Sequence, residues 1–366
     1  MIWKPLSINH LWALARVIIL LIIIYLGRTN LDLYCPNSDR PEIHLKRNKA
    51  ISIECIVPLS ENQIIQDTRK VLSGNIFSQT ISLNKCGNIS SQFFKEFNFT
   101  NITELKLRAH TNSGLNILFW LPELTKLQIA GHGDLQLTQK ILEKNTKLTV
   151  LYICNNNLES LEFLKNTTNL ETLNLHRNQI EFLKSDFFTN MTKLESLHIG
   201  GNKLRSLPAG LLDHLPQLKN FTINCNNFES FPSGLLRHNK HIKRFELDNH
   251  STLCRKEEKT RLPEKMFLSP NISLIKFKDV IISKIPGRWL AGCTGKYFNL
   301  LSIKNIESEG RCSVQHGLLY FVGLLTLIMD QCSLEVIPRK IFLETPNLIS
   351  LSLNNNRIRT LHFLPR

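Results

Sequence analysis

A repeated pattern of apolar residues constrains the fold of this 366-residue chain more than any other feature. The pattern LxxLxLxxNxL occurs five times with little variation, as LTVLYICNNNL, LETLNLHRNQI, LESLHIGGNKL, LKNFTINCNNF and LISLSLNNNRI. These copies begin at Leu148, Leu170, Leu194, Leu218 and Leu348. A period of about 24 residues is typical of solenoids, in which each unit packs only on its neighbours.

Weaker copies of the same pattern extend the array in both directions. They begin at Ser78, Ile102, Leu124, Ile242, Ile272, Phe298 and Leu324. The sequence therefore predicts about twelve units over residues 78–366, with an incomplete last unit. The second half of a unit also recurs, as an apolar pair, often a proline, and a buried Phe or Leu.

The spacing within a unit explains how it folds. Apolar residues at the first, fourth, sixth and eleventh positions point into one core, and the L-x-L in the middle is a short strand with alternating faces. Strands of successive units then stack as a parallel sheet. The ninth-position asparagine can bond the turn backbone through its amide. This predicted ladder comprises Asn156, Asn178, Asn202, Asn226 and Asn356.

From Ser78 to Arg366 the chain resembles the leucine-rich-repeat family, in its extracellular class of roughly 24 residues per unit. The resemblance implies an α/β repeat fold. The expected architecture is a horseshoe-shaped solenoid with a parallel concave β-sheet and an irregular convex side.

The N-terminus carries a targeting signal. Lys4 and Arg16 precede the apolar run Val17–Leu26, whose ten residues fit a signal peptide and fall short of the roughly 20 that span a bilayer. We expect a cleaved signal peptide over 1–27, with an uncleaved anchor as the alternative. Either segment places the body of the chain outside the cell or in the secretory lumen.

Eight Asn-x-Ser/Thr sequons support an extracellular glycoprotein. They are at Asn88, Asn98, Asn101, Asn166, Asn190, Asn220, Asn249 and Asn271. Asn220 takes the third position of its unit, which faces out of the concave sheet. A glycan there would block the middle of the concave face and direct a ligand to the N-terminal third or to a flank.

Nine cysteines in an oxidising compartment predict disulfides. Cys35 and Cys55 flank a cap region over 28–77, and we expect them to pair, although either could pair elsewhere. Two of Cys254, Cys293 and Cys312 are expected to bond, and which two stays open. The cysteines within the repeat motif are expected to be unpaired, small buried or strand-edge residues. These are Cys86, Cys154, Cys225 and Cys332.

The sequence contains no catalytic or cofactor motif, so we expect a binding protein and no enzyme. No metal site is expected, because His110, His132 and His250 fall in separate units and His238 and His241 lack a third ligand. The formal net charge of +15 would attract anionic partners or simply keep the chain soluble. Nucleic acid is not expected for a chain outside the cell.

Residues between the strand leucines predict the concave surface. A basic bias from the fifth unit onward suggests a ligand patch, although a solvated strand face explains it equally well. The candidate residues are His176, Arg177, His198, Arg244, Lys276, Lys278 and Lys304.

A signal sequence, a cysteine-bounded cap, many sequons and 24-residue units with irregular inserts together resemble the ectodomain of insect Toll-type receptors. That resemblance implies binding of a secreted protein or another leucine-rich-repeat chain, receptor dimerisation, and signalling in innate immunity or development. The chain lacks the family's membrane-proximal cysteine cap, membrane span and intracellular domain, so we expect a truncated receptor. Membrane association is expected only through the N-terminal segment or a missing C-terminal span. The alternative is a secreted ligand trap or adhesion module.

Overall fold

The computed structural model describes most of the chain between residues 50 and 359. The described residues are 50–54, 61–71, 79–84, 89–99, 101–108, 112–131, 137–248, 259–260, 274–278, 281–282, 297–301, 304–305, 325–328, 330, 335 and 347–359. Several expectations therefore lie outside them: the signal segment, Asn88, Asn249, Asn271, Cys35, Cys55, Cys86, Cys254, Cys293, Cys312 and Cys332.

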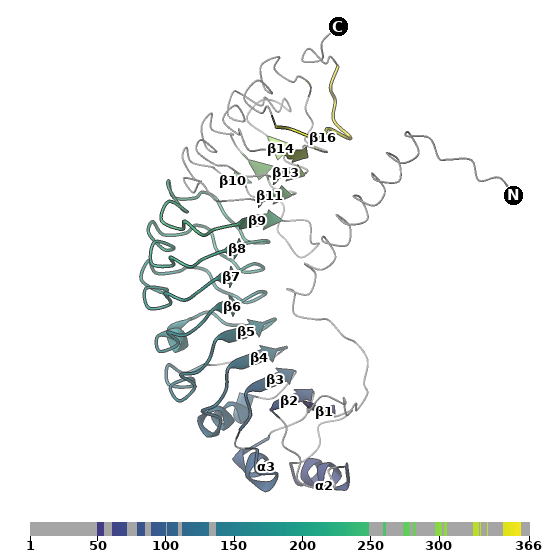
Figure 1. The fold of residues 1–366 in the computed structure, drawn as a ribbon, viewed down its shortest axis with the longest axis vertical. Helices are drawn as coiled ribbons and strands as arrows, with labels where there is room; N and C mark the ends of the chain where they lie inside the picture. Colours follow the sequence, from purple (N-terminus) through teal and green to yellow (C-terminus); the bar gives the residue numbers. More distant parts are fainter. Residues whose placement is uncertain are drawn as a thin grey trace, which may run out of the picture. The chain divides into compact units, whose positions relative to one another are not determined.

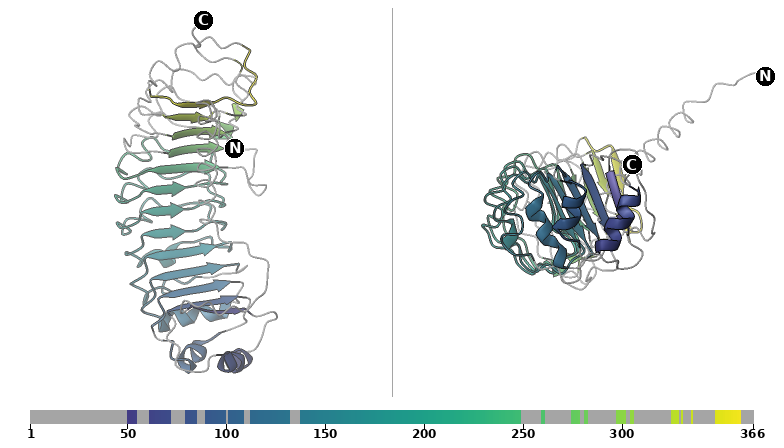
Figure 2. Two further views of the ribbon diagram at one scale, coloured as in Figure 1. Left: turned by 45° about the vertical axis from the view of Figure 1, so that its right-hand side comes forward. Right: turned by 90° about the horizontal axis from the view of Figure 1, so that it is seen from below.

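The described strands form one long parallel sheet and one short sheet (Figures 1 and 2). The long sheet has 13 strands that pair in chain order. They are β1 (Ala50–Glu54), β2 (Thr80–Asn84), β3 (Glu104–Arg108), β4 (Lys126–Ala130), β5 (Val150–Cys154), β6 (Thr172–Asn174), β7 (Ser196–His198), β8 (Asn220–Thr222), β9 (Arg244–Asp248), β11 (Leu274–Lys278), β13 (Tyr297–Leu301), β15 (Thr326–Ile328) and β16 (Ser350–Ser352). The short parallel sheet contains β10 (Lys259–Thr260), β12 (Ile281–Ile282) and β14 (Lys304–Asn305).

Helical segments and turns occupy the side opposite the long sheet (Figure 1). They are the α-helices α2 (Glu61–Val71) and α3 (Ser91–Glu96) and the 3-10 helices η2 (Asn112–Trp120) and η3 (Glu162–Leu164). This arrangement is the leucine-rich-repeat solenoid that the spacing predicts, with a parallel sheet on one side and irregular structure on the other. Among the described residues, no helix combines the length and apolar character that crossing a membrane requires.

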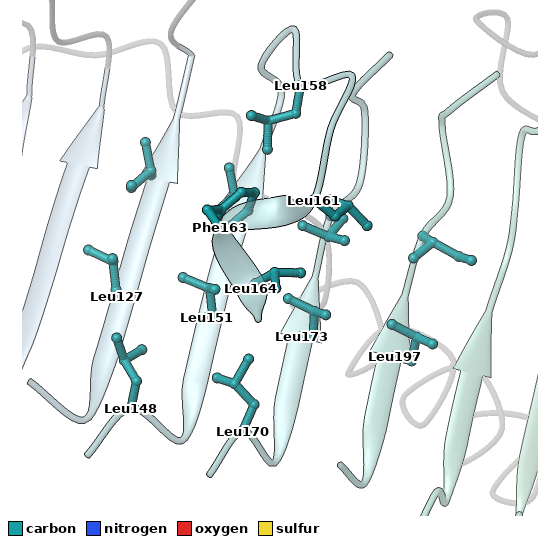
Figure 3. Packing of buried hydrophobic residues seen from close by; sticks show 14 of the residues in the cluster. Leu127, Leu148, Leu151, Leu158, Leu161, Phe163, Leu164, Leu170, Leu173 and Leu197 are labelled. Atoms are coloured by element: carbon teal, nitrogen blue, oxygen red, sulfur yellow. The ribbon is translucent and has the colours of Figure 1, made fainter. Parts of the chain in front are cut away.

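The core is built from the repeated apolar positions. Leu127, Leu151, Leu173 and Leu197 take the fourth position of successive units, are fully buried, and line up across neighbouring strands (Figure 3). The convex half closes the core over them with residues of and around η3, including Phe163. Each unit therefore buries its apolar face only against adjacent units, as expected for a solenoid.

The predicted register of one unit is wrong. Phe298 pairs with Ile275 on one side and Leu327 on the other, so it takes the fourth position and not the first. The sequence FNLLSI allows both readings, because apolar residues stand three and two positions after Phe298. As a result Lys304, expected on the concave sheet, lies in β14 of the short sheet.

Candidate binding surface

The ninth-position asparagines hold the strands of successive units in register. Nδ2 of Asn178 donates to the carbonyls of Leu175 in its own unit (2.9 Å) and of Ile153 in the preceding unit (2.8 Å). Its Oδ1 accepts from the backbone N–H of Leu158 at 3.3 Å. Asn202 and Asn226 make the same three kinds of bond.

The ends of the ladder differ slightly from its centre. Asn156 donates to Ile129 (3.2 Å) and to Cys154 (3.0 Å), and Asn356 donates to Leu353 (2.8 Å). Each buried amide therefore satisfies backbone groups that the turn would otherwise leave unpaired. The result is a stiff sheet whose exposed face is set by the third and fifth positions of each unit.

A charged and aromatic cluster covers the concave face over β3 to β5. Glu104 lies between two lysines, with its Oε1 3.2 Å from Lys106 Nζ and 3.0 Å from Lys126 Nζ. Lys126 Nζ also lies 5.9 Å from the centroid of the Tyr152 ring. Two ammonium groups and one carboxylate leave the cluster with a net positive charge. We call these four residues the N-terminal cluster.

The protonation state of Glu104 follows from its neighbours. Partial burial works against ionisation, but the hydrogen bond from Lys126 and the charge of Lys106 outweigh it, so the pKa of Glu104 is lowered. The carboxylate therefore stays ionised at neutral pH and fixes both lysine side chains on the concave face.

The middle of the concave face is uncharged. Its third positions in β6 to β8 are Thr172, Ser196 and Asn220, and its fifth positions are Asn174, His198 and Thr222. Asn220 is half-buried, and its Nδ2 donates to Ser196 Oγ at 3.0 Å. The basic bias that we predicted from the fifth unit onward is therefore absent from these three strands.

His198 is a buried histidine of this middle region. Burial and then the charge of Arg244 lower its pKa to about 4, so the ring is neutral at physiological pH. Its Nε2 atom is buried and has no hydrogen-bond partner in the structure. Because the ring is neutral, burying it with one unpaired nitrogen costs less than burying a charged ring would.

His176 and Arg177 are placed differently from our expectation. Both follow β6, at the seventh and eighth positions of the unit, and so lie in the turn beyond the strand. His176 is buried, and Arg177 adopts a positive φ of 56°. Burial, followed by the charges of Arg177 and His198, lowers the pKa of His176 to about 4, against the opposing effect of a hydrogen bond that the ring donates to the Gly200 backbone. His176 and Arg177 therefore pack in the turn, and the concave position of this strand is occupied by Asn174.

A second charged region begins at β9. Arg244 Nη1 lies 3.4 Å from Glu246 Oε1. In the register of the sheet, Lys276 stands beside Glu246 and Lys278 beside Asp248. The two charged regions of the concave sheet are thus separated by the neutral strands β6 to β8.

The described sequons fall into two groups. Asn98, Asn101, Asn166 and Asn190 are exposed and lie outside the strands, whereas Asn220 lies within β8. Glycosylation at the first four would leave the concave face clear. Glycosylation at Asn220 would separate the two charged regions.

Cys154 and Cys225 correct our expectation for cysteines of the repeat motif. We expected both to be unpaired, yet both are disulfide-bonded. They belong to units three strands apart, a separation of about 14 Å at the usual strand spacing, so they are not bonded to each other. Motif position predicted the burial of Cys154, but it predicted the disulfide of neither residue.

The geometry suits recognition of a macromolecule. Within the described ranges, no three His, Cys, Asp or Glu side chains converge as they would around a metal ion. Sequence reasoning missed the N-terminal cluster, although its residues are simply the third and fifth positions of the units that begin at Ile102, Leu124 and Leu148. Broad, partly charged sheets of this kind offer extended contact area rather than an enclosed catalytic pocket.

Comparison with known proteins agrees with this fold. A family model described as "Leucine rich repeat" matches residues 168–228, and one described as "Leucine Rich repeats (2 copies)" matches residues 146–188. No curated protein sequence matches the chain.

Solved structures with this fold include receptor ectodomains and a bacterial protein. Toll in the Drosophila Toll–Spatzle complex is 18% identical with a TM-score of 0.57, and the match covers 84% of this chain and 43% of Toll. A leucine-rich-repeat protein of Leptospira interrogans is 19% identical with a TM-score of 0.60, covering 84% and 72% of the two chains. The receptor in a TLR13–ssRNA13 complex is 17% identical with a TM-score of 0.54, covering 81% and 40%.

This chain spans less than half the length of the Toll and TLR13 chains that it matches. The repeat spacing, the solenoid and the matched family models agree with one another. Residues 146–228 match the leucine-rich-repeat family, and the chain folds as a leucine-rich-repeat solenoid that resembles the structures of Toll-type receptors.

Proposed function

We propose that this chain is the ligand-binding ectodomain of a Toll-like signalling receptor that acts in innate immunity or development. The observation that carries the proposal is the N-terminal cluster, which the neutral strands β6 to β8 separate from the charged region that begins at β9. Tyr152, which is partly exposed, provides the aromatic contact that is enriched at protein interfaces, and the two lysines provide charge complementarity to an acidic ligand. The fold shared with Toll, which is bound to Spatzle in the matched structure, supports a secreted protein as the ligand.

The ligand would contact β3 to β5 first. Lys106 and Lys126 are partly exposed and would pair with an acidic patch of the ligand, while Tyr152 would pack beside them. A glycan on Asn220 would exclude the ligand from β7 and β8 and so restrict it to the N-terminal third. Signal peptide, glycosylation and extracellular location belong to the same proposal.

A secreted ligand trap or adhesion module is the second candidate. It is supported by the Leptospira protein, which has the same fold over 72% of its own length. The two functions differ in the segments that they need besides the repeats. A receptor needs a membrane span and an intracellular domain, whereas a trap acts as a free protein.

Sequencing the native transcript beyond the codon for Arg366 separates the two functions. We expect an open frame that encodes more repeats, a cysteine-rich cap, a membrane span and a signalling domain. A stop codon at that point, with the protein recovered from the medium, would contradict the receptor and favour the trap.

The binding site is tested by charge reversal. In the full receptor that a continuing reading frame would encode, expressed in cells that report its activation, K106E together with K126E should abolish the response to co-expressed secreted proteins of the same organism. K203E is the matched control, because Lys203 is exposed and its ion pair with Glu181 lies outside the strands. An unchanged response of the double variant would exclude the N-terminal cluster as the ligand-binding site.

A further inference from the structure

The convex side carries an exposed aromatic pair beside a sequon. Phe119 and Trp120, at the end of η2, are 40% and 52% exposed. Contiguous apolar surface of this kind can mark a contact site. Lys95 of α3 lies above the Trp120 ring, with its Nζ 4.2 Å from the ring centroid. This contact places the indole against the C-terminal end of α3.

Asn98 is held rigidly at that same end. The N–H of Asn98 donates to the Lys95 carbonyl at 3.1 Å, and the N–H of Phe99 donates to the Phe94 carbonyl at 2.8 Å. These two bonds form a Schellman motif in which Asn98 is the left-handed residue, with φ of 51°. The rings of Phe94 and Phe99 pack edge to face at 6.5 Å, which supplies the hydrophobic contact typical of the motif.

The side chains around Asn98 divide between core and solvent. Phe99 is buried, whereas Asn98 itself is exposed. The sequon Asn98-Phe99-Thr100 is thus anchored by its middle residue, while its asparagine amide is available for modification. Asn98 stands three residues after Lys95, just past the end of α3.

We propose that Asn98 carries an N-glycan whose first sugars pack over Trp120 and Phe119 and cover this aromatic pair. The inference rests on the proposed secretory route. The carbon-bound hydrogens of a sugar ring carry partial positive charge and suit the negative face of an indole ring. The same contact removes apolar surface from water. The first sugars extend farther from the backbone than the Lys95 side chain that already reaches the indole.

The test uses the full chain secreted from eukaryotic cells. Glycopeptide mass spectrometry measures occupancy at Asn98, Asn166 and Asn190, and hydroxyl-radical footprinting measures the oxidation rate of Trp120. We expect an occupied Asn98 and a several-fold faster oxidation of Trp120 in N98G. Glycine suits the left-handed position, so N98G removes the glycan and keeps the Schellman motif. N166Q is the control and should leave the rate unchanged.

Enzymatic removal of glycans from the native protein provides the same comparison if N98G is not secreted. Oxidation of Trp120 at the same rate with and without the glycan would overturn the inference. An empty Asn98 beside occupied Asn166 and Asn190 would also overturn it, but would leave the secretory route intact. Empty sequons throughout the secreted chain would likewise overturn only the inference, whereas failure of the chain to enter the secretory pathway would contradict the proposed extracellular location.

Discussion

At the scale of single residues, asparagine side chains satisfy many of the backbone carbonyls in this solenoid. Besides the ninth-position ladder, Asn145 and Asn239 stand three residues before the first apolar position of the next unit. Nδ2 of Asn145 donates to Leu118 and Leu121, and Nδ2 of Asn239 donates to Leu212 and Leu215. One side chain thus satisfies several carbonyls of a neighbouring unit, on both sides of the core.

Replacing Asn202 by alanine tests the value of this arrangement. Nδ2 of Asn202 donates to Leu175 and Ile199, and its Oδ1 accepts from Ile180. Asn202→Ala leaves these buried groups unpaired and should lower the free energy of unfolding by about 3 kcal/mol. Asn157→Ala, at an exposed position, should change it by less than about 0.5 kcal/mol. The denaturant midpoints of the two variants measure this difference. Equal midpoints would mean that water takes over the hydrogen bonds of the Asn202 amide.

The buried histidines predict a dependence of stability on pH. The folded pKa of about 4 for His176 and His198 lies below the unfolded value of 6.5, so between these values only the unfolded chain binds the protons. Above pH 6.5 the rings are neutral in both states, so they do not lower the free energy of unfolding. The free energy of unfolding falls as the pH drops from 6.5 toward 4. Each ring contributes about 3 kcal/mol to that loss.

Thermal unfolding of wild type and H198Q between pH 7.5 and 4.5 measures this loss. The charges that act on the rings are those of Arg177 and His198 on His176, and that of Arg244 on His198. We expect the melting temperature of H198Q to fall less steeply with acidification. Parallel pH profiles would show that His198 becomes protonated without a penalty.

At the scale of elements, the first two helices are joined by one carboxylate. Glu61, the first residue of α2, caps the N-terminus of α3: its Oε1 accepts from the Ser90 N–H (2.9 Å), the Ser90 hydroxyl (2.8 Å) and the Phe93 N–H (3.2 Å). A carboxylate at a helix N-terminus pairs with free N–H groups and with the helix dipole. This contact ties the cap region to the first repeat.

Removing the cap should loosen this end of the solenoid. Glu61→Ala should cost about 1–2 kcal/mol and increase amide hydrogen exchange over residues 89–99. Arg69→Ala is the control, because it breaks the exposed ion pair with Glu96 (3.1 Å) between the same two helices and should cost less than about 1 kcal/mol. If the amide hydrogens of residues 89–99 exchange at the same rate in both variants, apolar packing rather than the Glu61 cap holds α2 in place.

At the scale of the whole molecule, the repeat made the fold predictable, while details that depend on register or on distant partners were not. Strands β5 to β8 follow from the leucine spacing because only one register buries every leucine. At Phe298 two registers bury apolar residues equally well, and the neighbouring strands decide between them. The disulfides of Cys154 and Cys225 depend on distant partners, which motif position does not encode. The neutral middle of the concave face, in contrast, can be read from the third and fifth positions of the units that begin at Leu170, Leu194 and Leu218.

The equivalence of units predicts which internal deletions the chain tolerates. Deleting the 24 residues His198–Phe221 removes one whole period and joins Leu197 to Thr222, so every later residue keeps its position in the unit. Asn226 would then donate to the Leu175 carbonyl, which Asn202 uses in the intact chain. Because each unit contacts only its neighbours, the shortened protein should be secreted and unfold cooperatively at a lower melting temperature.

A deletion one residue shorter provides the matched control. Removing His198–Asn220 joins Leu197 to Phe221, which shifts the following residues by one position. Phe221 would then face the concave side, Thr222 would enter the core, and Asn226 would leave the ladder, because side chains alternate along a strand. We expect this variant to be retained in the cell. Equal secretion of both proteins would mean that the turns absorb the extra residue and that strand register is not what holds the units together.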